Sequence, residues 1–161
     1  MRKFEIISEE QWAKDISVLD NPQCSLIDHL KPHRSTKYSA GYDFISPIEI
    51  VIPAHGMAKI PTGIKAQMNE DEVLYIYSRS SIGFKTAIRL SNVVGVVDCD
   101  YYNNPDNEGH IFIKFFNPTD KNYQVHIGDK IAQGIFTKYL TVDDEEEIEI
   151  ERSGGLGSTG K

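Results

Sequence analysis

Short apolar segments, separated by turn signals every ten residues or so, fill the chain from Tyr42 onward. Many short strands at this spacing predict an all-β sandwich or barrel. Alternation between two strand faces is visible, though imperfect, in residues 110–116, which read His-Ile-Phe-Ile-Lys-Phe-Phe. The expected strands cover residues 48–52, 57–60, 64–68, 73–78, 87–90, 93–97, 110–117, 123–127 and 130–140.

The N-terminal part of the chain departs from this pattern. Residues 8–11 read Ser-Glu-Glu-Gln and resemble a capping box. They predict a short helix over residues 9–15, with Trp12 as its buried anchor. Residues 16–40 are expected to be irregular.

The C-terminal part also differs from the strand-rich middle. An acidic run at residues 143–147 is expected to be a solvated connector. Residues 148–151 alternate like a strand that covers an edge, which suggests an arm that packs on a neighbouring subunit. The glycine-rich residues 153–160 cannot hold one conformation by themselves and would become ordered with a ligand.

The composition is that of an ordinary globular chain with an acidic balance. It has 161 residues, enough for one domain with a real core, and a formal net charge of −7. This charge disfavours direct binding to nucleic acid but leaves a small anionic ligand open. No apolar run approaches the roughly 20 residues that span a bilayer, and charges occur too early for a secretory signal. Cys24 and Cys99 lack metal-ligand spacing, and two cysteines do not make a disulfide framework, so we expect a protein of the reducing cytoplasm without membrane contact.

Residues 92–101 read Asn-Val-Val-Gly-Val-Val-Asp-Cys-Asp-Tyr and combine an apolar run with two carboxylates. The valines expected to form a rigid buried wall are Val93, Val94, Val96 and Val97. Gly95 lets the backbone approach a ligand closely. Asp98 and Asp100 share a face in an extended chain and repel, which raises the proton affinity of at least one. Such a carboxylate can serve as a general base, although Asp is also common where a strand ends in a turn.

Two other segments combine cations, hydroxyls and backbone amides that suit phosphate. Residues 78–85 read Ser-Arg-Ser-Ser-Ile-Gly-Phe-Lys, in which Arg79 can pair two phosphate oxygens while Ser80 and Ser81 donate to others. A polar surface turn would explain the same residues equally well. Arg152 precedes Ser-Gly-Gly-Leu-Gly-Ser-Thr-Gly, whose glycines let amides converge on an anion, but the lysine and helix of a Walker-type loop are missing.

Five segments resemble, in order and spacing, the five motifs of the homotrimeric dUTP diphosphatase (dUTPase) family. They are residues 40–44 (Ala-Gly-Tyr-Asp-Phe), 78–85, 92–101, 128–133 (Gly-Asp-Lys-Ile-Ala-Gln) and 152–160. The resemblance implies hydrolysis of dUTP to dUMP and pyrophosphate, which limits uracil in DNA and supplies dUMP for thymidylate synthesis. It also implies a homotrimer with shared active sites. One chain would give the first, second and fourth motifs, another the third, and the last its tail.

The same resemblance divides the chain into three parts. Residues 1–39 are an N-terminal extension with the short helix, and residues 40–142 are the β-barrel catalytic domain. Residues 143–161 comprise the acidic connector, a swapped arm and a mobile lid. The expected fold is therefore all-β, a jelly-roll-like barrel with a short N-terminal helix and a flexible glycine-rich C-terminal arm.

The resemblance further implies roles for individual residues. Asp98 matches the base that activates a water for in-line attack on the α-phosphorus, and Asp43 matches a carboxylate that orients water or the hydrated metal. Tyr101 matches the ring that lies against deoxyribose and excludes a 2′-hydroxyl, and Asn92 matches the group that reads uracil. The expected substrate-binding residues are Asn92, Gly95, Val96, Tyr101, Arg79, Ser80, Ser81, Gln133, Arg152, Gly155, Leu156, Gly157, Ser158 and Thr159.

Mg²⁺ is the expected cofactor, held through the substrate and water. The sequence has no cluster of histidines and cysteines and no dense group of carboxylates that would bind a metal directly. The ion would therefore arrive on the triphosphate and keep several of its waters. Phosphoryl transfer needs mainly positioning and neutralisation of charge, which Arg79, Arg152 and Mg²⁺ would share.

The chain departs from the family pattern in several places, among them Ser81 in place of a frequent glycine and Phe44 in place of leucine. Leu156 stands where the family usually has an aromatic ring that stacks on uracil, so another ring is expected to replace it. The candidates are Phe112, Phe115, Phe116 and Tyr102. Residues 102–109 resemble a lengthened hairpin loop, and the helix at residues 9–15 has no explanation in the resemblance.

Two other functions stay open. The related dCTP deaminase fold shares the Arg-Ser-Ser element, although it does not normally show residues 98–101 followed by this glycine-rich tail. A regulatory module, in which a nucleotide-gated tail controls docking to a protein partner, could use residues 1–39 and the loop at residues 102–109.

Overall fold

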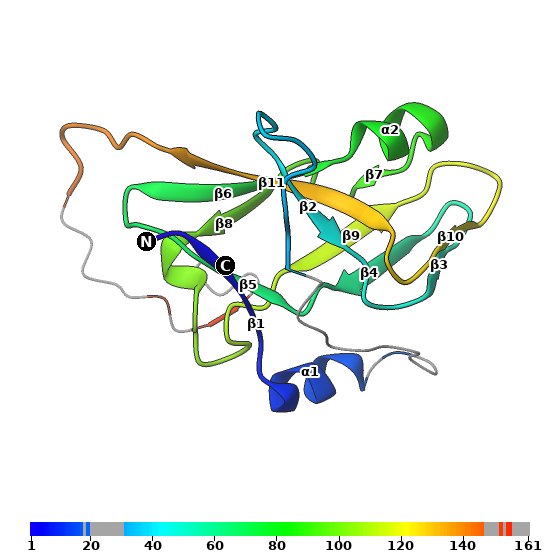
Figure 1. Ribbon diagram of the computed structural model, residues 1–161, viewed down its shortest axis with the longest axis horizontal. Coiled ribbons are helices and arrows are strands. Elements are labelled where there is room, and N and C mark those ends of the chain that lie inside the picture. The colour runs from blue at the N-terminus through cyan, green and yellow to red at the C-terminus, as the bar shows by residue number, and fades with distance from the viewer. Residues whose placement is uncertain (18, 20–30, 147–151, 153, 156–161) are drawn as a thin grey trace.

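The computed structural model describes residues 1–146 except 18 and 20–30, together with Arg152, Gly154 and Gly155. Eleven strands and two α-helices lie in that part of the chain (Figure 1). The strands are β1 (Lys3–Ile6), β2 (Tyr42–Ile45), β3 (Ile50–Ile52), β4 (Met57–Pro61), β5 (Ile64–Gln67), β6 (Glu72–Ser78), β7 (Arg89–Leu90), β8 (Gly95–Asp98), β9 (Phe112–Phe116), β10 (Tyr123–Val125) and β11 (Lys130–Lys138). The helices are α1 (Glu9–Ile16) and α2 (Ser80–Thr86), and a 3₁₀ turn covers Cys99–Tyr101.

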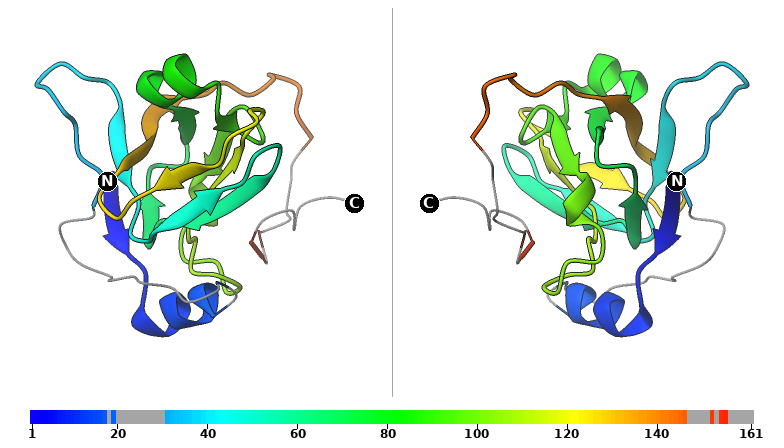
Figure 2. Two further views of the ribbon diagram at one scale, coloured as in Figure 1. Left: turned by 90° about the vertical axis from the view of Figure 1, so that its right-hand side faces the viewer. Right: turned by 90° about the vertical axis from the view of Figure 1, so that its left-hand side faces the viewer.

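Every strand pair in the described chain is antiparallel. The largest sheet has the order β2-β11-β6-β8, a second has the order β4-β9-β7, and β1-β5 and β10-β3 form two further pairs. Figures 1 and 2 show the sheets wrapped about one interior, with α1 and α2 on opposite sides of the molecule. The fully buried side chains Phe44, Leu74, Phe115 and Ile131 come from four different strands. The expected all-β, jelly-roll-like barrel is confirmed.

Helix α1 begins as the capping pattern predicts. The N–H of Gln11 donates to Oγ of Ser8 over 3.1 Å, and Trp12 is buried. The reciprocal half of the capping box does not form, because the Gln11 side chain donates to Asp15 instead (2.8 Å). The Ser8 N–H donates to the carboxylate of Glu108, which lies 100 residues further along the chain.

The nine expected strands are all present, and their ends differ from the expected ones by no more than two residues. Three further elements, β1, β2 and α2, were missed. β1 depends on its pairing with β5, from Lys3 opposite Gln67 to Ile6 opposite Ile64, and no local pattern shows a partner so far away. Helix α2 is rich in serine and buries Ile82 alone, so neither propensity nor periodicity indicates it.

The expectation that the valines before Asp98 form a buried wall is wrong for two of the four. Val93 is 72% exposed and Val96 is 60% exposed, while Val94 is half-buried and Val97 packs against the core. Val93 lies in the turn before β8, and Val96 projects from the face of β8 opposite to Val97, away from the core.

A pair of glycine substitutions tests the packing of the central strand. A Cβ added at Gly134 of β11 would lie 2.8 Å from Cε2 of Phe44 and 3.0 Å from Cδ1 of Leu74. We therefore expect Gly134→Ala to lower the free energy of unfolding by about 1–3 kcal/mol. Gly83→Ala in α2 is the control, since nothing lies within 4 Å of the added Cβ, and it should leave stability unchanged or raise it. Urea denaturation measures both, and equal effects would contradict the packing argument.

Candidate active site

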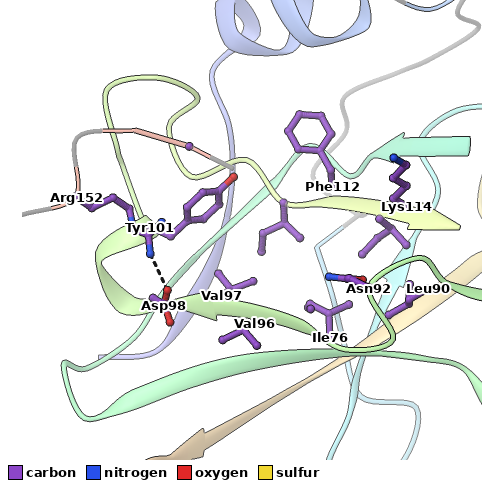
Figure 3. A pocket seen from close by; sticks show the side chains of 14 residues that line it. Ile76, Leu90, Asn92, Val96, Val97, Asp98, Tyr101, Phe112, Lys114 and Arg152 are labelled. Carbon is purple, nitrogen blue, oxygen red and sulfur yellow. Dashed lines mark hydrogen bonds and ion pairs between the residues drawn. The ribbon is translucent and has the colours of Figure 1, made fainter. Parts of the chain in front are cut away.

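A cavity of about 250 Å³ lies between β8 and β9 (Figure 3). Its floor is apolar, and its polar side chains lie at the two ends. Asn92 and Lys114 stand at one end, and Asp98 and Tyr101 stand at the other. Phe112 of β9 borders the cavity on the side away from β8. The arrangement suits a ligand with a flat apolar body and hydrogen-bonding groups at its edges.

Arg152 closes the cavity at the Asp98 end. Its Nη2 lies 2.6 Å from Oδ2 of Asp98, and its Nε lies 2.7 Å from Oδ1 of Asp100. The Arg152 side chain is 12% exposed, whereas both carboxylates are 52% exposed. The expected pair of neighbouring carboxylates therefore exists, and one guanidinium compensates its charge. The chain between them is a 3₁₀ turn rather than the extended strand that we expected.

Tyr101 forms a fixed wall of the same cavity. Its hydroxyl donates to the carbonyl of His110 (2.9 Å) and accepts from Nδ2 of Asn107 (2.8 Å). Burial raises the pKa of Tyr101, so the phenol stays neutral. The Arg152 guanidinium carbon lies 5.7 Å from the ring centroid, which adds a cation–π contact.

Asn92 lies in a tight turn that leads into β8. The next residue, Val93, has a φ of 64°, a left-handed conformation that is costly for a β-branched side chain. A Cβ added at Gly95 would lie 3.1 Å from Cβ of Ile76 and 3.8 Å from Nδ2 of Asn92. The small residue thus lets β8 lie close to β6 while the Asn92 side chain extends into the cavity (Figure 3).

The four rings that could replace an aromatic residue at position 156 lie in different surroundings. Phe112 borders the cavity. Phe115 is buried in the core, and the Arg89 guanidinium lies over Phe116, 5.0 Å from its centroid. The hydroxyl of Tyr102 donates to Glu5. Among these four rings, Phe112 alone lies where it could contact a ligand in this cavity.

A second cavity, of about 190 Å³, brings together the first, second and fourth motif segments. It is lined by Ser35, Ser39, Gly41, Asp43, Arg79, Ser80, Ser81 and Gln133. Gly41 and Gln133 pack closely, because a Cβ at Gly41 would lie 2.6 Å from Oε1 of Gln133. Gln133 lies opposite Asp43 in the ladder between β11 and β2. Residues far apart in sequence thus form one polar hollow, in which Arg79 is the cation and Asp43 the carboxylate.

Asp43 is the electrostatic centre of this second cavity. Nε of Arg79 lies 3.0 Å from its Oδ1, and Nζ of Lys130 lies 2.9 Å from its Oδ2. Oγ of Ser35 also donates to Oδ2, over 2.5 Å. Burial opposes the charge on Asp43, but Ser35 and Lys130, together with the charge of Arg79, outweigh it and lower the pKa of the carboxyl. Asp43 therefore holds Arg79, which lines the cavity, and Lys130 beside it.

The expected site residues fall into two groups, and the two cavities share no residue. The first group is Asn92, Gly95, Val96, Asp98, Tyr101, Arg152 and Gly155. The second is Asp43, Arg79, Ser80, Ser81 and Gln133. Leu156, Gly157, Ser158, Thr159 and the expected arm strand at 148–151 lie outside the described residues.

Sequence reasoning missed three polar residues that line these cavities, namely Ser35, Ser39 and Lys114, and it also missed Lys130, which pairs with Asp43. Lys130 lies inside the fourth motif segment, and its cation is paired with an acid 87 residues earlier in the chain. Lys114 follows the alternation of β9 to the exposed face, next to Phe112 in that pattern. The alternation was the only local signal for Lys114, and no local signal marks Ser35.

In the described part of the chain, no three His, Cys, Asp or Glu side chains group closely enough to hold a metal ion. None of the described helices is long and apolar enough to cross a membrane.

Neutralising Asp43 tests its role as an anchor for cations. Asp43→Asn keeps a partner for Ser35 but removes the charge that faces Arg79 and Lys130. We expect the variant to lose about 1–3 kcal/mol of stability at pH 7. Because the native pKa of Asp43 lies below its unfolded value, this advantage is complete above about pH 4–5 and is lost as the pH falls. Urea denaturation at pH 7 and pH 3 measures the difference, and a difference that does not change with pH would contradict the assignment.

The sequence and the fold have close counterparts among known proteins. A model of the dUTPase family matches residues 29–160. The deoxyuridine 5′-triphosphate nucleotidohydrolase of Lactococcus lactis subsp. lactis (strain IL1403) is 52% identical over 131 residues, which cover 80% of this chain and 87% of that protein. The protein of the same name from Arabidopsis thaliana is 37% identical over 134 residues, covering 80% and 75%. The crystal structure of dUTPase from Streptococcus mutans aligns with a TM-score of 0.74 and 38% identity over 88% of this chain and 98% of that chain. The chain therefore belongs to the dUTPase family.

Proposed function

We propose that this chain hydrolyses dUTP to dUMP and pyrophosphate. The observation that carries the proposal is the position of Asp98, which lies at the rim of a cavity that also presents Asn92 and Tyr101. The 52% identical relative from Lactococcus lactis is named for the same reaction. Residues of the first, second and fourth motif segments line one cavity, and residues of the third and fifth line the other.

The cavity between β8 and β9 fits the nucleoside part of the substrate. At about 250 Å³ it is smaller than the 300–1,000 Å³ typical of sites for drug-sized ligands, so it suits a nucleoside better than a whole triphosphate. Asn92 offers both an amide donor and an acceptor for the edge of uracil. The fixed ring of Tyr101 would lie against deoxyribose, where an added 2′-hydroxyl has no room.

The cavity around Asp43 fits the phosphates. Arg79, Ser80, Ser81 and Gln133 offer a cation and several neutral donors, and Asp43 orients the cation. A triphosphate carries nearly four negative charges, so it needs this set in addition to Arg152. Because one chain places the two sets in separate cavities, we propose that a neighbouring copy in a homotrimer brings them together.

The exposed valines of the edge strand support such an assembly. Val93 and Val96 project from the turn and strand that carry Asn92 and Asp98. Uncovered apolar side chains at a sheet edge mark a surface that a partner would bury. The exchange of the C-terminal arm between copies stays part of the proposal, since within one chain Arg152 contacts that chain's own Asp98.

In the proposed reaction, Asp98 takes a proton from a water molecule positioned behind the α-phosphorus. The water oxygen forms a bond to that phosphorus, the bond to the bridging oxygen breaks, and pyrophosphate leaves in line. The triphosphate would compete with Asp98 and Asp100 for Arg152, and transfer of this guanidinium to phosphate would free the carboxylate to accept the proton. Mg²⁺ bound to the triphosphate would supply further charge neutralisation.

Asp98→Asn and Asp100→Asn form a matched pair for the base assignment, because each removes one of the two carboxylates that hold Arg152. We expect Asp98→Asn to bind dUTP but lose roughly 10²–10⁴ in turnover, and Asp100→Asn to stay within roughly tenfold of the unmodified chain. Pyrophosphate release from dUTP with Mg²⁺ measures turnover, and calorimetry measures binding. Equal losses in the two variants would remove the base role from Asp98.

We propose that Phe112 provides the aromatic contact to the base that Leu156 cannot provide. Phe112→Leu should raise KM for dUTP by roughly three- to tenfold without changing kcat, because a stacking contact is present in both substrate and transition state. Phe116→Leu is the control, since Phe116 lies on the same face of β9 but does not border the cavity. A shift in KM that is the same in both variants would contradict the role of Phe112.

Two further measurements separate the remaining alternatives. Release of ammonia from dCTP would indicate a deaminase. A protein partner that competes with dUTP would indicate an added regulatory role, and that role is compatible with hydrolysis.

A further inference from the structure

Helix α1 and the loop at residues 102–109 are the two features that the family pattern does not explain, and they contact each other. Nζ of Lys14 donates to the carbonyl of Asp106 over 2.9 Å, and the N–H of Ser8 donates to Glu108 over 3.1 Å. Figure 1 shows α1 beside this loop at the lower edge of the molecule. The loop is the segment that connects Tyr101 to β9, so these contacts reach the wall of the nucleoside cavity.

A further link between α1 and that wall joins the half-buried Asp15 to a fully buried histidine. Oδ2 of Asp15 lies 2.5 Å from Nδ1 of His110, whose side chain is 0% exposed. Nε2 of His110 accepts from the N–H of Gly63 over 2.8 Å, so the ring proton must reside on Nδ1 and point at Asp15. Burial lowers the pKa of His110 in spite of the nearby carboxylate, which keeps the ring neutral.

His110 contacts two residues that line the cavity. Its backbone carbonyl accepts the hydroxyl of Tyr101, and its ring centroid lies 4.1 Å from that of Phe112. The loop holds the same hydroxyl from the other side through Nδ2 of Asn107. Nδ2 of Asn104 in turn donates to the carbonyl of Tyr101 (2.8 Å) and to Oδ1 of Asn107 (2.8 Å). Both asparagines are buried, so the network is shielded from competing water.

The loop at residues 102–109 also contacts Gly155 of the C-terminal segment. The N–H of Gly155 donates to Oδ2 of Asp106 over 3.3 Å. A Cβ at Gly155 would lie 2.7 Å from this oxygen and 3.0 Å from Nδ2 of Asn107. Gly155 thus lies so close to Asp106 and Asn107 that a residue with a side chain would not fit there without a shift.

We propose that Asp15 is a positioning residue for sugar discrimination, which acts through His110 to fix the ring of Tyr101. The inference rests on the proposed function, in which Tyr101 excludes the 2′-hydroxyl of a ribonucleotide. Ribose differs from deoxyribose by one oxygen, so a displacement of the ring by a fraction of an ångström admits or rejects it. The N-terminal helix and the lengthened loop then serve as a brace for the specificity of this chain.

Sugar discrimination is measured as the ratio of kcat/KM for dUTP to kcat/KM for UTP, with the full chain and Mg²⁺. Asp15→Ala should lower this ratio by roughly tenfold, which corresponds to the loss of one charge-assisted hydrogen bond, while kcat for dUTP changes little. Asp15→Asn should restore the ratio, because its amide oxygen accepts from Nδ1 of His110. Glu10→Ala is the control, since Glu10 is exposed on the same helix.

Tyr101→Phe gives a second test that does not depend on the stability of α1. It keeps the ring but removes the hydroxyl that binds the His110 carbonyl and Asn107. This variant should lower the ratio as Asp15→Ala does, and the double variant should show little further change because the two act on one network. A ratio that is unchanged in Tyr101→Phe would overturn the proposal.

Two outcomes separate this inference from the proposed function. If Asp15→Ala lowers thermal stability and the activity on both substrates alike, with the ratio unchanged, α1 is a structural support only and the inference is wrong. If Tyr101→Ala still rejects UTP, the sugar check assigned to Tyr101 is itself wrong. Admission of UTP by Tyr101→Ala, together with an unchanged ratio in Asp15→Ala, would overturn the inference alone.

Discussion

The antiparallel ladder of β6 with its two neighbours is the constraint on which both cavities depend. Ile76 of β6 pairs with Gly95 of β8, which sets the floor of the nucleoside cavity, and the ladder continues to Asp98. On its other side, β6 pairs with β11 and places Gln133 opposite Tyr77, just before β6 ends and Arg79 begins the phosphate cavity. The same buried strand thus fixes a candidate base and a candidate phosphate ligand, and the core beneath it makes both positions rigid.

The carboxylates of the two cavities also determine where the cations lie. The chain carries a net charge of −7, yet its substrate is a polyanion, so cations have to be gathered locally. Asp43 gathers Arg79 and Lys130, and the pair Asp98 and Asp100 gathers Arg152. In the proposed reaction, Asp43 keeps Arg79 in position for phosphate, which would reduce the entropy lost on binding, whereas Arg152 would exchange its carboxylate partners for phosphate.

Patterns within short stretches of sequence predicted most of the strands and the start of helix α1. The nine strands and the Ser8 cap follow from alternation and capping, and the order of the motif segments led to the residues that line both cavities. Local pattern did not predict features that depend on contacts between residues distant in sequence. Val93 and Val96 are exposed because the first lies in a turn and the second on the outer face of β8. β1 exists only through its pairing with β5, and Lys130 acquires its role from Asp43, to which no spacing connects it.

The central claim is that one active site combines the Asp98 cavity of one copy with the Arg79 cavity of another. A mixing experiment tests it most directly. Asp98→Asn chains and Arg79→Ala chains, each inactive alone, are unfolded, mixed in equal amounts and refolded together. If sites are shared between copies, pyrophosphate release from dUTP should return to about a quarter of the unmodified level, since random assembly pairs two intact cavities in that fraction of sites. Activity no higher than that of the separate variants would show that each chain builds its site alone.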